Sequence, residues 1–168
     1  MSERLSAKRL RELLHYNAET GLFHWAVKRN GSKGIDSPAG SPNQKGHINI
    51  GIDGVRYMAH RLAWLYVYGR WPEKELDHIN RVKADNRIAN LREVSRSQNV
   101  QNTLLRANNK SGQKGVCWKK EKGVWGASIA VNGKQYHLGY YLSLEAASAA
   151  YKKAAARFHT HNPVSEGA

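Results

Sequence analysis

The chain has 168 residues, a length that allows one domain or two or three very small ones. It carries 27 Lys and Arg against 13 Asp and Glu, a formal net charge of +14. No apolar run approaches the roughly 20 residues of a membrane-spanning helix, and the first residues lack the apolar stretch of a secretory signal. The single Cys117 excludes an internal disulfide and a multi-cysteine zinc site. We therefore expect a cytoplasmic protein with an anionic partner.

The positive charge is spread along the chain and does not form a basic tail. Residues 1–60 hold nine basic and five acidic side chains, residues 61–99 hold eight and five, and residues 100–168 hold ten and three. Such a surface is attracted to phosphate backbones, because bound Lys and Arg release condensed counterions. The alternative is a soluble basic protein without a specific partner.

The first segment, residues 1–57, has the pattern of a small, loop-rich α+β piece. Ser6 can cap a helix whose leucines follow at helical spacing. We then expect a strand over 22–27, a loop over 28–46, and a hairpin with strands 47–52 and 55–58. The Asp53-Gly54 pair favours the hairpin because these residues accept the positive φ of tight turns.

The second segment, residues 58–105, predicts a helix followed by a strand–loop–strand–helix unit. The helix covers 61–68 and ends at Gly69. Short strands are expected at 75–78 and 91–94, around a polar loop. Ser95 and Gln98 form an S-x-x-Q capping box, which opens the last helix.

Three polar residues of this unit suggest hydrolytic chemistry. Asp77 and Asn99 offer oxygen ligands that suit a hard cation such as Mg²⁺. His78 has the side chain best suited to remove a proton from water near neutral pH. Adjacent strand residues face opposite ways, so both can serve one site only if the strand ends there. The alternative is structural: His78 ends a strand and Asp77 caps a turn.

A resemblance to a known family supports the hydrolytic interpretation. The stretches His60–Trp64, Leu76–Asn80, Asp85–Arg87, Asn90–Arg92 and Ser97–Asn99 closely resemble the HNH endonucleases of phages and homing elements. The resemblance covers about 57–102 and implies a ββα-metal finger. It implies that His78 is the general base, that Asp77 and Asn99 bind the metal, and that Asn90 holds the loop and orients His78. Because Asn99 stands where many relatives have His, we expect one Mg²⁺ or Mn²⁺ ion.

Other residues of this segment have two interpretations each. Arg61, Arg87, Arg92 and Arg96 could neutralise DNA phosphates, or could be solvated surface side chains. His60 could contact phosphate or metal, or could serve the start of its helix.

The third segment, residues 113–162, follows a linker at 106–112 and predicts three strands and one helix. The strands are expected at 115–119, 124–131 and 134–140, with Asn132-Gly133 as a hairpin turn. Ser143 can cap a helix from Leu144 to about Phe158. Its expected apolar stripe comprises Leu144, Ala147, Tyr151, Ala154 and Phe158.

This segment resembles the AP2 DNA-binding domain through Gly115-Val116, Trp125, Leu138–Tyr141 and the alanine-rich helix. The resemblance implies a three-stranded antiparallel sheet packed on one helix, with the sheet in the DNA major groove. It points to five DNA-contacting candidates: Lys114, Trp118, Lys120, Trp125 and His137.

Together these features predict an α+β protein that acts as a metal-dependent endonuclease on double-stranded DNA. We expect a monomer with neither a membrane nor a protein partner, in the host cytoplasm if a phage encodes it. A non-catalytic DNA-binding regulator and an RNA-binding or RNA-cleaving protein remain the alternatives.

Overall fold

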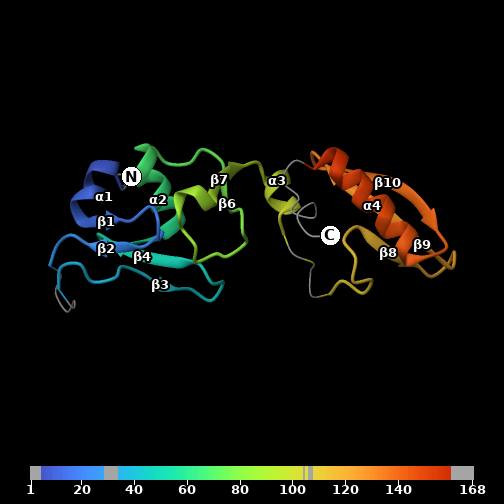
Figure 1. Cartoon of the computed structure of the whole chain (residues 1–168), viewed down its shortest axis with the longest axis horizontal. Helices are drawn as coiled ribbons and strands as arrows, with labels where there is room; N and C mark the ends of the chain where they lie inside the picture. Colours follow the sequence, from blue (N-terminus) through green and yellow to red (C-terminus); the bar gives the residue numbers. More distant parts are fainter. Residues whose placement is uncertain (1–4, 29–33, 104, 106–107, 160–168) are drawn as a thin grey trace. The chain divides into compact units, whose positions relative to one another are not determined.

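The computed structural model describes residues 5–28, 34–103, 105 and 108–159 (Figure 1). Helices combine with small antiparallel sheets, so the predicted α+β class is confirmed. By their contacts, the residues divide into two compact units, Met1–Val94 and Ser95–Ala168. Within the described ranges, no helix is long and apolar enough to cross a membrane.

The first unit contains three small antiparallel sheets and two α-helices. Its elements are α1 (Ala7–Leu13), β1 (Leu14–Tyr16), β2 (Phe23–Trp25), β3 (Ser41–Pro42), β4 (Ile48–Ile52), β5 (Val55–Met58), α2 (Ala59–Tyr68), β6 (Glu75–His78), the 3₁₀ turn η1 (Ile88–Asn90) and β7 (Leu91–Val94). The sheets are β1-β2, β3-β4-β5 and β6-β7. The Ser6 cap, the hairpin at Asp53-Gly54 and both finger strands are confirmed.

One hydrophobic core holds the helices and strands of the first unit together. It collects Leu10 from α1, Phe23 from β2, Ile50 from β4, Leu62 from α2 and Leu91 from β7. Each of these side chains is at most 6% exposed. The segment before residue 58 and the β6-β7 hairpin therefore share a core, which fixes the hairpin against α2 and the N-terminal strands.

The second unit contains a three-stranded antiparallel sheet and a helix that packs on it (Figure 1). Its elements are α3 (Arg96–Gln101), β8 (Val116–Lys119), β9 (Val124–Val131), β10 (Lys134–Tyr141) and α4 (Leu144–Phe158). The strand order is β10-β9-β8. Both bonds of the Ser95–Gln98 capping box form, and Ser143 caps α4 as predicted.

The core of the second unit lies between the sheet and α4. Ala127 and Ile129 of β9 pack with Ala147 and Tyr151 of α4. The expected apolar stripe is wrong at its end: Phe158 is 45% exposed, because the core does not extend under the last turn of α4.

Candidate functional site

The two central residues of the predicted site lie at the end of β6. Asp77 pairs with Arg92 of β7 and His78 pairs with Leu91. Asp77 is 7% exposed and His78 6%, although they are adjacent in the strand. Because His78 is the last residue of β6, the chain turns there, which allows both neighbours to be buried.

The carboxylate of Asp77 is held by an arginine. Nε and Nη2 of Arg92 donate hydrogen bonds of 3.0 Å and 2.8 Å to Oδ2 of Asp77. The side chain of Asp77 is 8% exposed and that of Arg92 27%. A buried carboxylate needs such a partner, because removing one side of a buried ion pair costs about 3–5 kcal/mol. In this structure Arg92 therefore positions Asp77, and its expected contact with a phosphate stays a prediction.

Asn90 ties together the loop that follows β6. Its Oδ1 accepts a 3.0 Å hydrogen bond from the amide of Asn80. Its Nδ2 donates bonds of 2.9 Å to Oδ1 of Asn80 and to the carbonyl oxygen of Asp85. The Asn90 side chain thus bridges the two ends of the loop, and its expected role in orienting His78 stays a prediction.

Asn86 is a site residue that sequence reasoning missed. It is 2% exposed, and its Oδ1 lies 3.5 Å from Nε2 of His78. The hydroxyl of Tyr16 in β1 donates a 2.7 Å hydrogen bond to the carbonyl oxygen of Asn86. Tyr16 precedes Asn86 by 70 positions, so no local sequence signal links them. The N-terminal strand therefore supports the loop that positions the imidazole of His78.

We expect Tyr16→Phe to change how stability depends on alkaline pH. Burial raises the pKa of Tyr16 from 10.0 to about 12. Between these values the unfolded chain releases the phenolic proton and the folded chain keeps it, so the free energy of unfolding falls by about 1.4 kcal/mol per pH unit. Below pH 10 both states are protonated and this loss is absent. Urea titrations at pH 9 and pH 11 should show that the difference in free energy of unfolding between the wild type and Tyr16→Phe becomes smaller at the higher pH. The same difference at both pH values would contradict the burial of a protonated Tyr16 hydroxyl.

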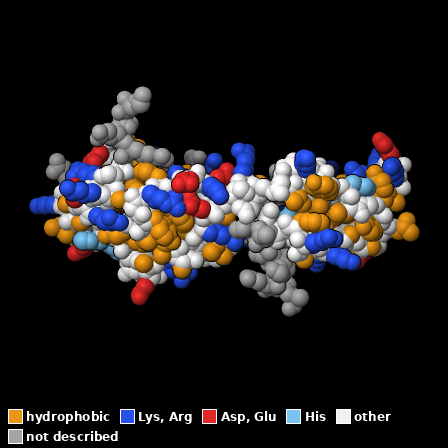
Figure 2. Space-filling view, turned by 90° about the horizontal axis from the view of Figure 1, so that it is seen from above, with side chains coloured by type: hydrophobic (Ala, Val, Ile, Leu, Met, Phe, Trp, Pro, Cys, Tyr) orange, Lys and Arg blue, Asp and Glu red, His pale blue; other side chains and the backbone are white. Residues whose placement is uncertain are grey.

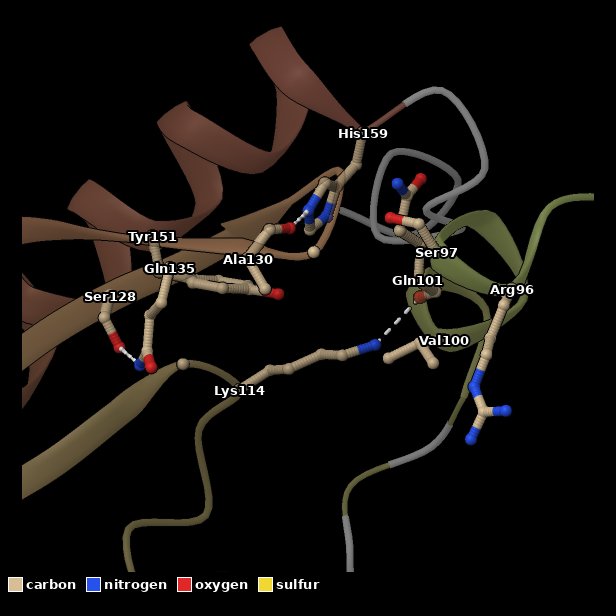
Figure 3. Close-up of a pocket in the computed structure, with 12 residues that line it drawn as sticks. Arg96, Ser97, Val100, Gln101, Lys114, Ser128, Ala130, Gln135, Tyr151 and His159 are labelled. Carbon is tan, nitrogen blue, oxygen red and sulfur yellow. Dashed lines mark hydrogen bonds between the residues drawn. The ribbon is translucent and has the colours of Figure 1, made fainter.

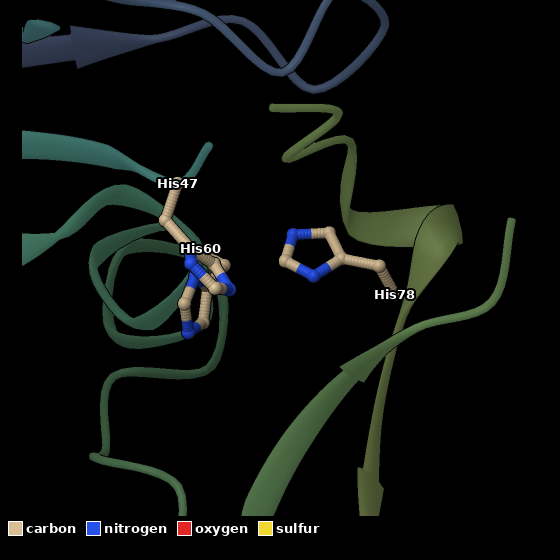
Figure 4. A group of neighbouring side chains, drawn as sticks. All are labelled: His47, His60 and His78. Carbon is tan, nitrogen blue, oxygen red and sulfur yellow. The ribbon is translucent and has the colours of Figure 1, made fainter. Parts of the chain in front are cut away.

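A cluster of three histidines surrounds His78. His47 precedes β4, His60 lies in the first turn of α2, and His78 ends β6 (Figure 4). One ring nitrogen from each lies within 4.8 Å of the others. The ring centroids of His60 and His78 are 5.1 Å apart, and those of His47 and His78 are 5.9 Å apart. The sequence singled out His60 without deciding its role and gave no signal for His47, which only the fold brings to the cluster.

Burial is the largest influence on the pKa values of the three histidines of this cluster. Burial lowers the pKa of all three imidazoles, and for His60 it lowers the pKa to about 3. Among the residues that the structure describes, Nδ1 of His47 and Nδ1 of His60 are buried without a hydrogen-bond partner. A lowered pKa favours the neutral form of each imidazole, in which one ring nitrogen carries a lone pair.

The remaining predicted residues of the HNH-like stretch are distributed over several elements and have different partners. Arg87 is paired with Asp85, with Nη2 2.6 Å from Oδ2, and Arg87 holds the pKa of that carboxyl at about 2. The guanidinium of Arg61 lies 5.8 Å from the ring centre of Trp71. Asn99 and Arg96 belong to α3, in the second unit. That Asn99 joins Asp77 in one metal site stays a prediction.

The sheet of the second unit has one face covered by α4 and one open face. Trp125 lies on the covered face with Ala127 and packs against the core. The centroids of the Trp125 and Trp118 rings are 5.0 Å apart, in an edge-to-face arrangement. On the open face, His137 of β10 pairs with Ser128, and its ring centroid lies 4.4 Å from that of Tyr140, with the two rings tilted by 56°. Of the five predicted DNA contacts, His137 thus lies on the open face, whereas both tryptophans lie on the covered side.

The two predicted lysine contacts differ in their surroundings. Nζ of Lys114 donates 2.8 Å hydrogen bonds to the carbonyl oxygens of Gln101 and Thr103, at the edge of a pocket of about 690 Å³ (Figure 3). Lys120 is exposed in the turn after β8. The expected role of Lys114 in DNA contact stays a prediction, and its visible role is to fasten the end of α3 inside the second unit.

Comparisons with known proteins support the nuclease assignment for part of the chain. The family model described as HNH endonuclease matches residues 57–101. Protein 3.8 of Escherichia phage T7 is 30% identical over 79 residues, which cover 46% of this chain and 65% of that protein. No solved structure matches the chain significantly. The stretch from α2 to α3, which carries Asp77, His78 and Asn90, is therefore similar to HNH endonucleases.

Proposed function

We propose that this protein is a metal-dependent endonuclease that hydrolyses phosphodiester bonds of double-stranded DNA. The observation that carries the proposal is the neutral, buried imidazole of His78 next to the carboxylate of Asp77. Both lie within the stretch that matches the HNH endonuclease family model.

In this proposal His78 is the general base. Burial keeps its ring neutral, so a ring nitrogen can take a proton from the water that attacks phosphorus. Asn86 and the loop tied by Asn90 fix the direction of the ring. A base held in one orientation loses less entropy on reaching the transition state than a mobile one.

Asp77 and Asn99 would hold the divalent ion. A carboxylate and an amide oxygen are donors that Mg²⁺ and Mn²⁺ prefer, and Arg92 keeps the buried carboxylate in one orientation. When bound, such an ion supplies Lewis-acid stabilisation of the leaving 3′ oxygen.

The second unit would bind the DNA. Its open face combines His137 and Tyr140 with Lys119, and the ammonium of Lys122 lies 4.2 Å from the Tyr140 ring centre. Lys and Arg side chains are spread over the visible surface, with fewer Asp and Glu (Figure 2). Phosphate contacts by these cations provide affinity without sequence preference.

The test is a nicking assay on supercoiled plasmid with purified protein and Mg²⁺. We expect conversion to open-circular DNA that stops when EDTA is added, and resumes with excess Mg²⁺. A single set of catalytic residues per chain favours nicking over simultaneous cutting of both strands. Binding without cleavage in Mg²⁺ or Mn²⁺ would identify a non-catalytic DNA-binding protein, and cleavage confined to RNA of equal length would identify a ribonuclease.

A further inference from the structure

Three histidines from distant parts of the sequence come together in the first unit. His47, His60 and His78 come from the loop before β4, from α2 and from β6. His60 is 6% exposed and His78 is 6% exposed, while His47 is partly exposed. Figure 4 shows the rings of His47 and His60 on one side and the ring of His78 opposite them, with ring nitrogens between.

Two ring nitrogens of this cluster make no hydrogen bond with a described residue. Nδ1 of His47 and Nδ1 of His60 are buried and have no hydrogen-bond partner among the described residues. Leaving a buried polar atom unpaired is unfavourable, because the atom loses its hydrogen bonds to water and gains none in return. Two such atoms in one group of histidines are therefore unfavourable for a purely structural role.

The spacing of the three histidine nitrogens would suit a transition-metal ion after a small inward movement of the side chains. Zinc–nitrogen bonds of about 2.0–2.1 Å in tetrahedral geometry require ligand nitrogens about 3.3 Å apart. The nitrogens here lie within 4.8 Å of one another. Small side-chain rotations that move each nitrogen by less than about 1 Å would bring the nitrogens to this spacing.

We propose that His47, His60 and His78 form a binding site for a transition-metal ion such as Zn²⁺, separate from the oxygen-donor site at Asp77. Neutral imidazoles are ligands for Zn²⁺, Co²⁺ and Ni²⁺, whereas Mg²⁺ prefers oxygen. Three histidines leave one tetrahedral position for water.

Occupation of this site has a consequence for cleavage, which rests on the proposed function. If His78 coordinates the ion through the nitrogen that accepts the proton of water, its lone pair is no longer available to a base. Zn²⁺ therefore opposes the reaction that Mg²⁺ supports. The pair of sites makes the enzyme sensitive to the ratio of transition metal to Mg²⁺.

The test measures metal binding to the full-length protein without DNA. We expect Zn²⁺ to bind with one-to-one stoichiometry in calorimetry, and Co²⁺ to give the visible absorption of nitrogen coordination in an enclosed site. His47→Ala should weaken Zn²⁺ binding at least tenfold, whereas His15→Ala, which changes an exposed histidine of β1, should not. Equal affinity of His47→Ala and the wild type would overturn the site.

Two further measurements separate this inference from the proposed function. Zn²⁺ should raise the melting temperature of the wild type and of His15→Ala but not that of His47→Gln, a variant that keeps most of the side-chain volume. In nicking assays with Mg²⁺, added Zn²⁺ should inhibit the wild type more strongly than His47→Ala, each relative to its own rate without Zn²⁺. A protein that binds Zn²⁺ but never cuts DNA would refute the function alone; one that cuts DNA but binds no Zn²⁺ would refute the site alone.

Discussion

Replacing His78 with alanine is expected to lower the rate of plasmid nicking by about 100- to 10,000-fold, the usual contribution of a general base. The reason is local: the imidazole at the end of β6 is buried and neutral, and Asn86 and the Asn90-tied loop position it. The expected loss lies in the rate constant at saturating DNA, because the base acts on the attacking water and not on the DNA backbone. Single-turnover cleavage in Mg²⁺ measures this rate.

DNA affinity provides the control for this prediction. His78→Ala should bind duplex DNA within about twofold of the wild type, since Lys and Arg supply the contacts with phosphates. His78→Gln, which retains hydrogen-bonding capacity toward Asn86, should be equally inactive. A cleavage rate close to that of the wild type in a folded His78→Ala protein would refute the role of His78.

Gly21→Ala should destabilise the first unit by about 3 kcal/mol or more. Gly21 has φ +72°, and a Cβ there would lie 2.4 Å from the amide nitrogen of Arg87 and 2.7 Å from the carbonyl carbon of Asn86. The left-handed conformation costs a non-glycine residue about 1–2 kcal/mol, and forced overpacking adds about 1–3 kcal/mol. Because both atoms belong to the backbone, no side-chain rotation can relieve the contact. We expect a melting temperature lower by more than about 10 °C.

The same substitution should slow cleavage in the molecules that remain folded. Asn86 would have to move away from Gly21, and it carries the Oδ1 atom that contacts the ring of His78. Gly54→Ala is the matched control: φ is +80° and a Cβ meets nothing within 4 Å, so only the backbone strain of about 1–2 kcal/mol is added. Similar melting temperatures for the two variants would show that the predicted close approach is absent.

The amino-acid sequence determined most of the local elements and their types, although it did not indicate β1, and β3 lies in a segment that it predicted to be a loop. Ser6, Ser95 and Ser143 cap helices because their side-chain oxygens accept from the backbone near by. The Asp53-Gly54 turn sets the register of β4 and β5 through two residues with positive φ. These features depend on neighbours within a few positions, which is why a linear pattern is sufficient to predict them.

The C-terminal sheet shows where periodicity stops being informative. Alternation along β9 places Trp125, Ala127 and Ile129 on one face, but does not say which face α4 covers. The structure places the helix over that face, so Trp125 packs against the core and His137 lies on the open side. Packing between the helix and the sheet determines which face is covered. The alternation of side chains along a strand is the same whichever face the helix covers.

For the site, sequence order determined that Asp77, His78 and Asn90 lie around one short hairpin. Only the tertiary structure decided that Arg92 holds Asp77, that Tyr16 supports Asn86, and that His47 and His60 face His78. The physical reason is that a single hydrophobic core packs the N-terminal strands, α2 and the hairpin together, and that packing brings together side chains with no local relation in the chain.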